Sequence, residues 1–143
     1  MRTILRLTAV AVLVVLATGV RAQPPADLVG VYQLEGANPD GTTYNGFVEM
    51  SVSGDVWALR WHFPPTGESV GLGMLNGDVL SVIFQTDAGA VGLATFTVNR
   101  TDGIVLSGSW LAPGAPMLGR ETLTKVTVIP ASPAVPDGPR IAV

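Results

Sequence analysis

The sequence predicts an all-β protein, a single antiparallel up-and-down barrel of eight strands, and three observations support this prediction. Short runs of apolar or alternating residues recur from residue 28 to about residue 128. No stretch within this region has the periodicity of a helix. Each run is separated from the next by a short segment containing Gly, Asn, Asp or Pro. A flat meander would leave two unprotected edges, so we expect closure into a barrel; a two-sheet sandwich is the alternative.

The first 22 residues have the three parts of a secretory signal peptide. Two arginines precede an uncharged run of apolar and small residues, 7–20, and small or apolar residues precede a cleavage position after Ala22. The run is shorter than the roughly twenty residues that cross a bilayer. We therefore expect removal of residues 1–22, export of a barrel domain, 23–128, to the periplasm or the cell exterior, and no transmembrane anchor after cleavage.

The composition of the exported part restricts its stabilisation and its partners. The chain contains no cysteine, so the domain must be held by core packing rather than by disulfides. Removal of Arg2, Arg6 and Arg21 would leave five basic and eleven acidic residues, a formal charge of −6. This charge argues against a nucleic-acid partner, because nucleic-acid binding neutralises phosphates with Lys and Arg, and against an anionic lipid surface.

Eight strands are expected, and each is bounded by a turn sequence. Asn76-Gly77 is the sharpest turn signal, and we expect a type I′ turn there, with positive φ at both central residues. An interior enclosed by eight strands is wide enough to be filled by side chains or to hold one small ligand. The expected strands are 28–35, 44–52, 56–63, 70–75, 79–85, 91–98, 104–110 and 119–128.

Alternation along the strands predicts which side chains face inward. In strand 56–63, Trp57 and Trp61 share one face, which is apolar, whereas Arg60 and His62 share the other. Strands 44–52 and 104–110 alternate as clearly. Strands 79–85 and 91–98 are too uniformly apolar or small to be assigned, so their outer faces are expected to be partly covered, by the tail or by a second copy.

Residues 129–143 form a Pro-rich C-terminal segment. Prolines at positions 130, 133, 136 and 139 recur every three residues, which places them on one face of a polyproline II helix. A docking segment or spacer is one interpretation of this pattern, and a disordered tail is the other.

The polar residues do not assemble into a recognisable catalytic or metal site. His62 has no second His and no Cys to join it in binding zinc, and no nucleophile-elbow sequence accompanies it. We therefore expect His62 to be a polar residue on the outer face of the barrel, near the end of its strand. The carboxylate pairs Asp40 with Glu35 and Asp55 with Asp78 lie in or beside turns, where Asp commonly bonds its own backbone. No catalytic residue, metal ligand or cofactor is predicted.

The aromatic side chains are the candidate ligand-binding residues. Large flat side chains around a small interior are suited to an apolar or ring-shaped ligand. The alternative is that they simply fill the barrel, since replacing them by a cavity would cost stability. The five aromatics expected to project inward are Tyr32, Tyr44, Trp57, Trp61 and Trp110.

Several short motifs together resemble a group of small exported bacterial proteins often labelled fibronectin-binding protein. The resemblance spans nearly the whole mature domain. It implies adhesion to a host matrix glycoprotein such as fibronectin, and it implies no particular binding residues. The motifs run in the order Gly30-Val31-Tyr32, Asp40-Gly41-Thr42-Thr43-Tyr44-Asn45-Gly46, Trp61, Gly71-Leu72-Gly73, Gly77-Asp78-Val79-Leu80, Gly108-Ser109-Trp110 and Gly119-Arg120-Glu121-Thr122-Leu123.

The chain also resembles, more loosely, the lipocalin and avidin-like barrels. Lipocalins open their first strand with Gly-x-Trp, and here Tyr32 takes the third position. The ending "GRETLTKV" is similar to the last strand of an avidin-type barrel, although the polar set that holds the ureido ring of biotin has no counterpart here. This likeness implies the barrel without implying biotin binding.

Three functional hypotheses follow. The first is a secreted, non-enzymatic binding protein that adheres to a protein partner, a matrix glycoprotein included. The second is a carrier of a small apolar ligand in a cavity lined by aromatics. The third is a hydrolase or isomerase on a barrel scaffold, which requires His62 or a carboxylate pair to face inward. A membrane barrel is disfavoured, because several strands are shorter than the roughly nine to eleven residues of a tilted span.

Overall fold

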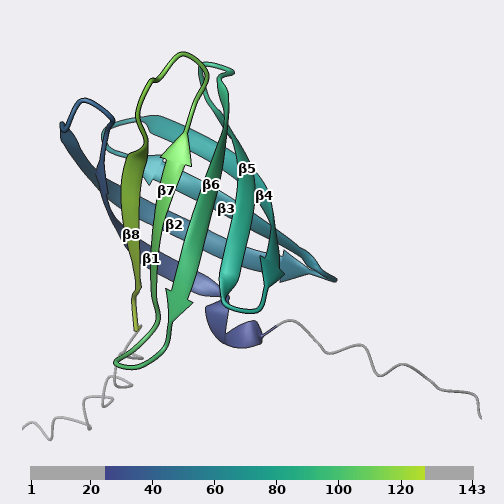
Figure 1. Ribbon diagram of the computed structural model, residues 1–143. Coiled ribbons are helices and arrows are strands. Elements are labelled where there is room, and N and C mark those ends of the chain that lie inside the picture. Colours follow the sequence, from purple (N-terminus) through teal and green to yellow (C-terminus); the bar gives the residue numbers. More distant parts are fainter. Residues whose placement is uncertain (1–24, 128–143) are drawn as a thin grey trace, which may run out of the picture.

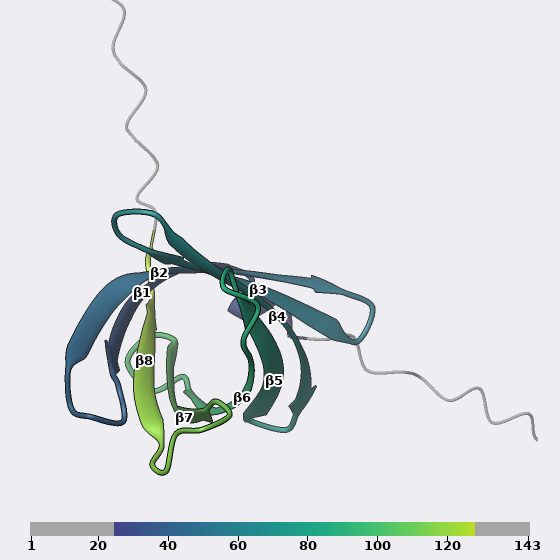
Figure 2. The same cartoon turned by 90° about the horizontal axis from the view of Figure 1, so that it is seen from above.

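The computed structural model describes residues 25–127, which form a closed barrel of eight antiparallel strands (Figure 1). Each strand pairs with the next, and β8 completes the barrel by pairing with β1 (Figure 2). The predicted fold class is confirmed. The predicted signal peptide and Pro-rich tail lie outside the described residues. The strands are β1 (Gly30–Ala37), β2 (Thr43–Ser53), β3 (Val56–Phe63), β4 (Gly67–Asn76), β5 (Val79–Thr86), β6 (Val91–Asn99), β7 (Val105–Leu111) and β8 (Gly119–Lys125).

The eight observed strands are the eight predicted, with small differences at their ends. β4 begins three residues before its predicted start, and β1 begins two residues after its own, because Ala26–Leu28 form a 3-10 turn, η1. A three-residue element is too short to show a periodicity, so the sequence pattern did not reveal it. Within residues 25–127, no helix is long and apolar enough to cross a membrane.

The turn between β4 and β5 differs from the predicted type I′ turn. Asn76 pairs with Val79 in the sheet, so the two central residues are Gly77 and Asp78. Gly77 has a φ of +61°, and none of the described non-glycine residues has a positive φ. The prediction of positive φ at both central residues was therefore wrong. Positive φ at the first central residue alone is typical of a type II′ turn, in which Gly is favoured at that position.

Side chains fill the half of the barrel nearest η1. The inward residues of every strand contribute to this packed region. On β5 and β6, whose faces could not be assigned from the sequence, the contributing residues are Leu80, Val82, Phe96 and Val98. This region supplies the core that a domain without disulfides requires. The largest side chains fully buried are Trp57, Tyr32, Phe96, Leu28, Leu34, Leu80, Leu106, Leu123 and Val48.

An apolar row crosses the outer surface of β4 to β7. Leu72, Ile83, Leu93 and Leu111 are successive cross-strand partners, and each remains between 43% and 57% exposed. This row explains why β5 and β6 looked uniformly apolar in sequence, since apolar residues occupy both of their faces.

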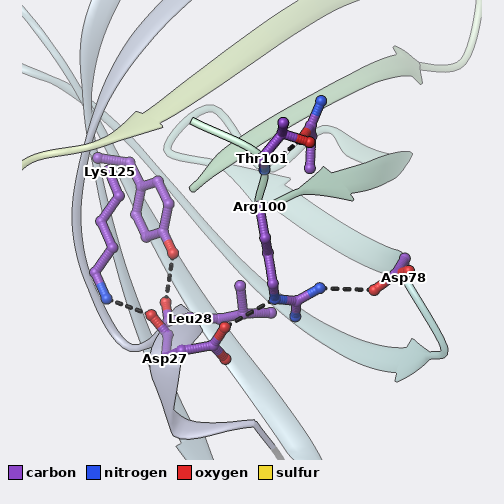
Figure 3. Close-up of polar contacts among 8 residues, drawn as sticks. Asp27, Leu28, Asp78, Arg100, Thr101 and Lys125 are labelled. Atoms are coloured by element: carbon purple, nitrogen blue, oxygen red, sulfur yellow. Dashed lines mark hydrogen bonds and ion pairs between the residues drawn. The ribbon is translucent and has the colours of Figure 1, made fainter. Parts of the chain in front are cut away.

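The turn η1 lies across one end of the barrel, which we call the closed end (Figure 1). Leu28 is fully buried, and the Tyr32 hydroxyl donates a buried hydrogen bond of 2.7 Å to the Leu28 carbonyl oxygen (Figure 3). Burial is the main reason why the pKa of Tyr32 is raised to about 12. The phenol therefore remains a hydrogen-bond donor throughout the neutral range.

Charged side chains tie the closed end together. Arg100, in the β6–β7 loop, donates to Asp27 at 2.8 Å and to Asp78 at 2.6 Å (Figure 3). Lys125 donates to the backbone oxygen of Asp27. These contacts join η1 to the β4–β5 turn, the β6–β7 loop and β8.

Candidate ligand-binding site

A cavity of about 430 Å³ lies at the end of the barrel opposite η1, which we call the open end. Residues at the ends of the strands and in the adjoining loops form its rim, and inward-facing strand residues form its wall. This volume is in the range of pockets that hold small organic ligands. The lining residues are Asn38, Tyr44, Trp61, Phe63, Ser69, Phe84, Thr86, Ala94, Trp110, Ala112 and Glu121.

Three of the lining aromatics stand opposite glycines on neighbouring strands. Tyr44 pairs with Gly36, Phe84 pairs with Gly92 and Trp110 pairs with Gly119. A Cβ atom at each of these glycines would overlap the ring of its partner. Each ring therefore occupies space that a side chain on the adjacent strand would otherwise take. This close approach of ring to backbone leaves room inside the barrel.

The aromatic rings also contact one another around the cavity. Phe84 lies between the two indoles, with ring centroids 6.1 Å from Trp61 and 6.3 Å from Trp110. Tyr44 and Phe63 form an edge-to-face pair with centroids 5.7 Å apart. Such pairs stabilise ring positions beyond the burial of their area, so the wall is preformed.

Glu121 is the one carboxylate among the lining residues of this cavity, and it accepts hydrogen bonds from two of the aromatics. The Tyr44 hydroxyl lies 2.7 Å from Oε1 of Glu121, and the Trp61 indole nitrogen lies 3.2 Å from Oε2. The Trp110 indole nitrogen donates to the Tyr44 hydroxyl oxygen at 2.8 Å. Glu121 itself is only 7% exposed. Four residues from four strands thus form one hydrogen-bonded network, which is partly buried.

Burial sets the protonation properties of this network. Desolvation raises the pKa of Glu121, although the hydrogen bonds from Tyr44 and Trp61 act in the opposite direction. Desolvation, followed by the charge of Glu121, raises the pKa of Tyr44. Tyr44 therefore keeps its proton and can serve as a donor, whereas ionisation of Glu121 in the empty cavity carries a cost.

His62 lies on the outer face of the barrel, as the alternation predicted. Its Nε2 lies 3.4 Å from Oε1 of Glu49 and its Nδ1 lies 3.3 Å from Oε1 of Glu68. Asp40 bonds the backbone nitrogen and the hydroxyl of Thr42, at 2.9 and 2.6 Å, so it organises a turn as expected. Within residues 25–127, no group of three or more His, Cys, Asp or Glu residues is placed to hold a metal ion.

The five aromatics proposed from the sequence divide between the two halves of the barrel. Tyr44, Trp61 and Trp110 line the cavity. Tyr32 and Trp57 do not, because they belong to the packed half, where both are fully buried. Their expected role as ligand contacts is corrected to a role in the core. Alternation alone gives the face of a residue but not its depth along the barrel axis.

Sequence reasoning missed the other lining residues, of which Phe63, Phe84 and Glu121 matter most to the site. Alternation could have identified Phe63, because it follows inward-facing Trp61 by two positions. It could also have identified Glu121, which lies midway between inward-facing Gly119 and Leu123. Phe84 belongs to a strand whose two faces are both apolar, so its direction carried no signal in the sequence.

Comparison with known proteins supports the fold. No protein-family model matches the chain, and no curated protein matches it. Among solved structures, the chain is similar to a de novo designed fluorescence-activating β-barrel, with a TM-score of 0.56 and 16% identity over 69% of this chain and 94% of the design. It is also similar to a structure of EF1p2_mFAP2b bound to DFHBI, with a TM-score of 0.53 and 13% identity over 70% of this chain and 94% of that one. Likeness at this identity establishes a shared barrel architecture.

Proposed function

We propose that this protein is a binding protein that holds a small, largely apolar ligand in the cavity at the open end of its barrel. The observation that carries the proposal is the cavity itself, which is walled by preformed aromatic rings and contains a single buried carboxylate. A domain of this size without disulfides gains stability when side chains fill its interior. Because the half lined by aromatic rings is not filled by side chains, we infer that a ligand occupies it.

The structural neighbours are consistent with this function. One is described as fluorescence-activating and the other as bound to DFHBI. By analogy, an interior of this architecture is able to accept a small molecule.

Filling the cavity from within tests the proposal. Ala94 lines the cavity, so Ala94→Leu adds three carbons to its interior. The matched control is Ala58→Leu on β3, where alternation directs the side chain outward. With 2-naphthylmethanol as a neutral ring-shaped probe, calorimetry is expected to show one binding site in the unmodified protein and in Ala58→Leu. Ala94→Leu is expected to weaken binding at least about tenfold.

Two results would contradict the proposal. One is the absence of binding to the unmodified protein at millimolar probe. The other is equal binding by Ala94→Leu, which would place the probe outside the cavity.

The hypotheses of catalysis and of adhesion have less support from the site than ligand binding has. Catalysis required an inward His62 or an inward carboxylate pair, whereas His62 faces outward and Glu121 lines the cavity without a second carboxylate. Adhesion to fibronectin stays a prediction from the resemblance, as does export. Retention of the protein on immobilised fibronectin is the direct test of adhesion.

A further inference from the structure

Resting on the proposed function, we further propose that the ligand is an organic cation, an aromatic or apolar body that carries a protonated amine, and that Glu121 receives the amine. The proposal depends on three features of the cavity: the direction of its hydrogen bonds, the absence of a protein cation beside Glu121, and the aromatic wall around it.

The hydrogen bonds of the network all point toward the carboxylate. An indole nitrogen can only donate, so Trp61 must donate to Glu121, and Trp110 must donate to the Tyr44 oxygen. The Tyr44 proton is then free to be donated to Glu121. This orientation matches an ionised carboxylate, which accepts every hydrogen bond it makes and has no proton of its own to place.

Two donors do not exhaust the acceptor capacity of a carboxylate. Its two oxygens offer about four lone-pair positions, and Tyr44 and Trp61 occupy one on each oxygen. Because Glu121 lines the cavity, its remaining positions are available to a donor that enters from the open end.

No basic side chain of residues 25–127 forms an ion pair with Glu121. Arg100 bridges Asp27 and Asp78 at the closed end, and Lys125 donates to the backbone there. Arg60 and Arg120 are exposed residues at outward-facing positions of β3 and β8. The buried charge therefore lacks the cationic partner that such charges normally have.

The wall suits a cation as well as an apolar body. Trp61, Phe84, Trp110 and Tyr44 surround the same space, and the faces of such rings attract ammonium groups. Burial raises the pKa of Glu121, so a bound ammonium group would stabilise the ionised form that the empty cavity disfavours. An anionic ligand would meet a like charge, and a purely apolar ligand would leave the carboxylate unpaired.

Three probes with the same ring and different charge test this inference. They are 2-naphthylmethylamine as the cation, 2-naphthylmethanol as the neutral compound and 2-naphthoate as the anion. Calorimetry at pH 7.5 is expected to show the amine binding at least about tenfold more tightly than the alcohol, a ratio that corresponds to about 1.4 kcal/mol. Naphthoate is expected to bind more weakly than the alcohol.

Glu121→Gln removes the charge while keeping the shape and an acceptor for Trp61. In this variant the preference for the amine over the alcohol should fall to less than about threefold, because the charge that distinguishes the two probes is gone. The matched control is Glu68→Gln, which removes one carboxylate from the outer face of β4, where the side chain is half exposed. The control should retain the full preference for the amine.

The outcomes separate this inference from the proposed function. If none of the three probes binds, the proposed function fails and the inference fails with it. If the alcohol binds and the amine is no tighter, the cavity is a binding site but the cationic ligand is wrong. A preference for the amine that persists in Glu121→Gln would also contradict the inference, because Glu121 would not be its source.

Discussion

At the scale of single residues, Glu121 is the feature that distinguishes this interior from an ordinary barrel core. A carboxyl group that is 7% exposed and hydrogen-bonded to two aromatic side chains is costly to ionise. The sequence offered a signal for it, since the residue alternates in phase with inward-facing Gly119 and Leu123. What the sequence could not supply is its partners, because Tyr44 and Trp61 are 77 and 60 positions away along the chain.

The raised pKa of Glu121 predicts a pH-dependent cost in stability. The folded protein holds this proton more tightly than the unfolded chain, whose carboxyl has the ordinary pKa of 4.5. Above 4.5, the stabilisation due to Glu121 therefore declines as pH rises toward the folded pKa. Relative to the unmodified protein, Glu121→Gln is expected to gain stability as pH increases from 4 to 8. Urea unfolding of both proteins across this range measures the difference, and a difference that is constant or that grows on acidification would contradict the assignment.

At the scale of elements, cross-strand pairs of glycine and aromatic residues shape the cavity. The strands themselves are predictable because alternation and turn residues are local signals, and this is why all eight were identified. The pairs of glycine and aromatic residues are not predictable in this way, because they depend on the register between strands. Trp110 meets Gly119 only when the seven-residue connection between β7 and β8 is accommodated. Register also explains the unexpected turn at Gly77, because the pairing of Asn76 with Val79 places the turn one residue later than predicted.

The pairing of Trp110 with Gly119 predicts the effect of one methyl group. In Gly119→Ala the new Cβ would overlap the indole, including the nitrogen that donates to the Tyr44 hydroxyl, so the ring must shift and disturb this hydrogen bond. We expect a loss of about 1–3 kcal/mol in the free energy of unfolding and at least tenfold weaker binding of 2-naphthylmethanol. Ser107→Thr, which adds a methyl group on the exposed face of β7, serves as the control and should change neither quantity appreciably. Normal probe binding by Gly119→Ala would show that the ring does not depend on this glycine.

At the scale of the whole molecule, the barrel has a packed half beside η1 and a hollow half at the open end. From the sequence, a filled barrel and a hollow barrel are alternatives, whereas the structure contains both a filled half and a hollow half. Depth along the barrel axis decides the role of each inward aromatic: Trp57 belongs to the core, and Trp110 belongs to the cavity wall. Sequence alternation reports only inside or outside, so it could not make this distinction.

The two halves should respond in opposite ways to changes in volume. Trp57→Ala creates a void in the packed half and is expected to lower the free energy of unfolding by about 3–5 kcal/mol. Ala94→Leu adds volume where space exists, so it is expected to change stability by less than the roughly 1–3 kcal/mol typical of overpacked cores. Chemical denaturation of both variants measures the contrast, and similar losses in the two would argue against a hollow half.

The central claim is that the open end of the barrel holds one small organic cation. Native mass spectrometry of the full chain, expressed in a bacterial host and titrated with 2-naphthylmethylamine, tests this claim most directly. We expect a complex with one bound probe that dissociates on gentle activation and that is strongly diminished in Ala94→Leu and in Glu121→Gln. A bare protein mass at millimolar probe, or equal adducts in all three proteins, would contradict it.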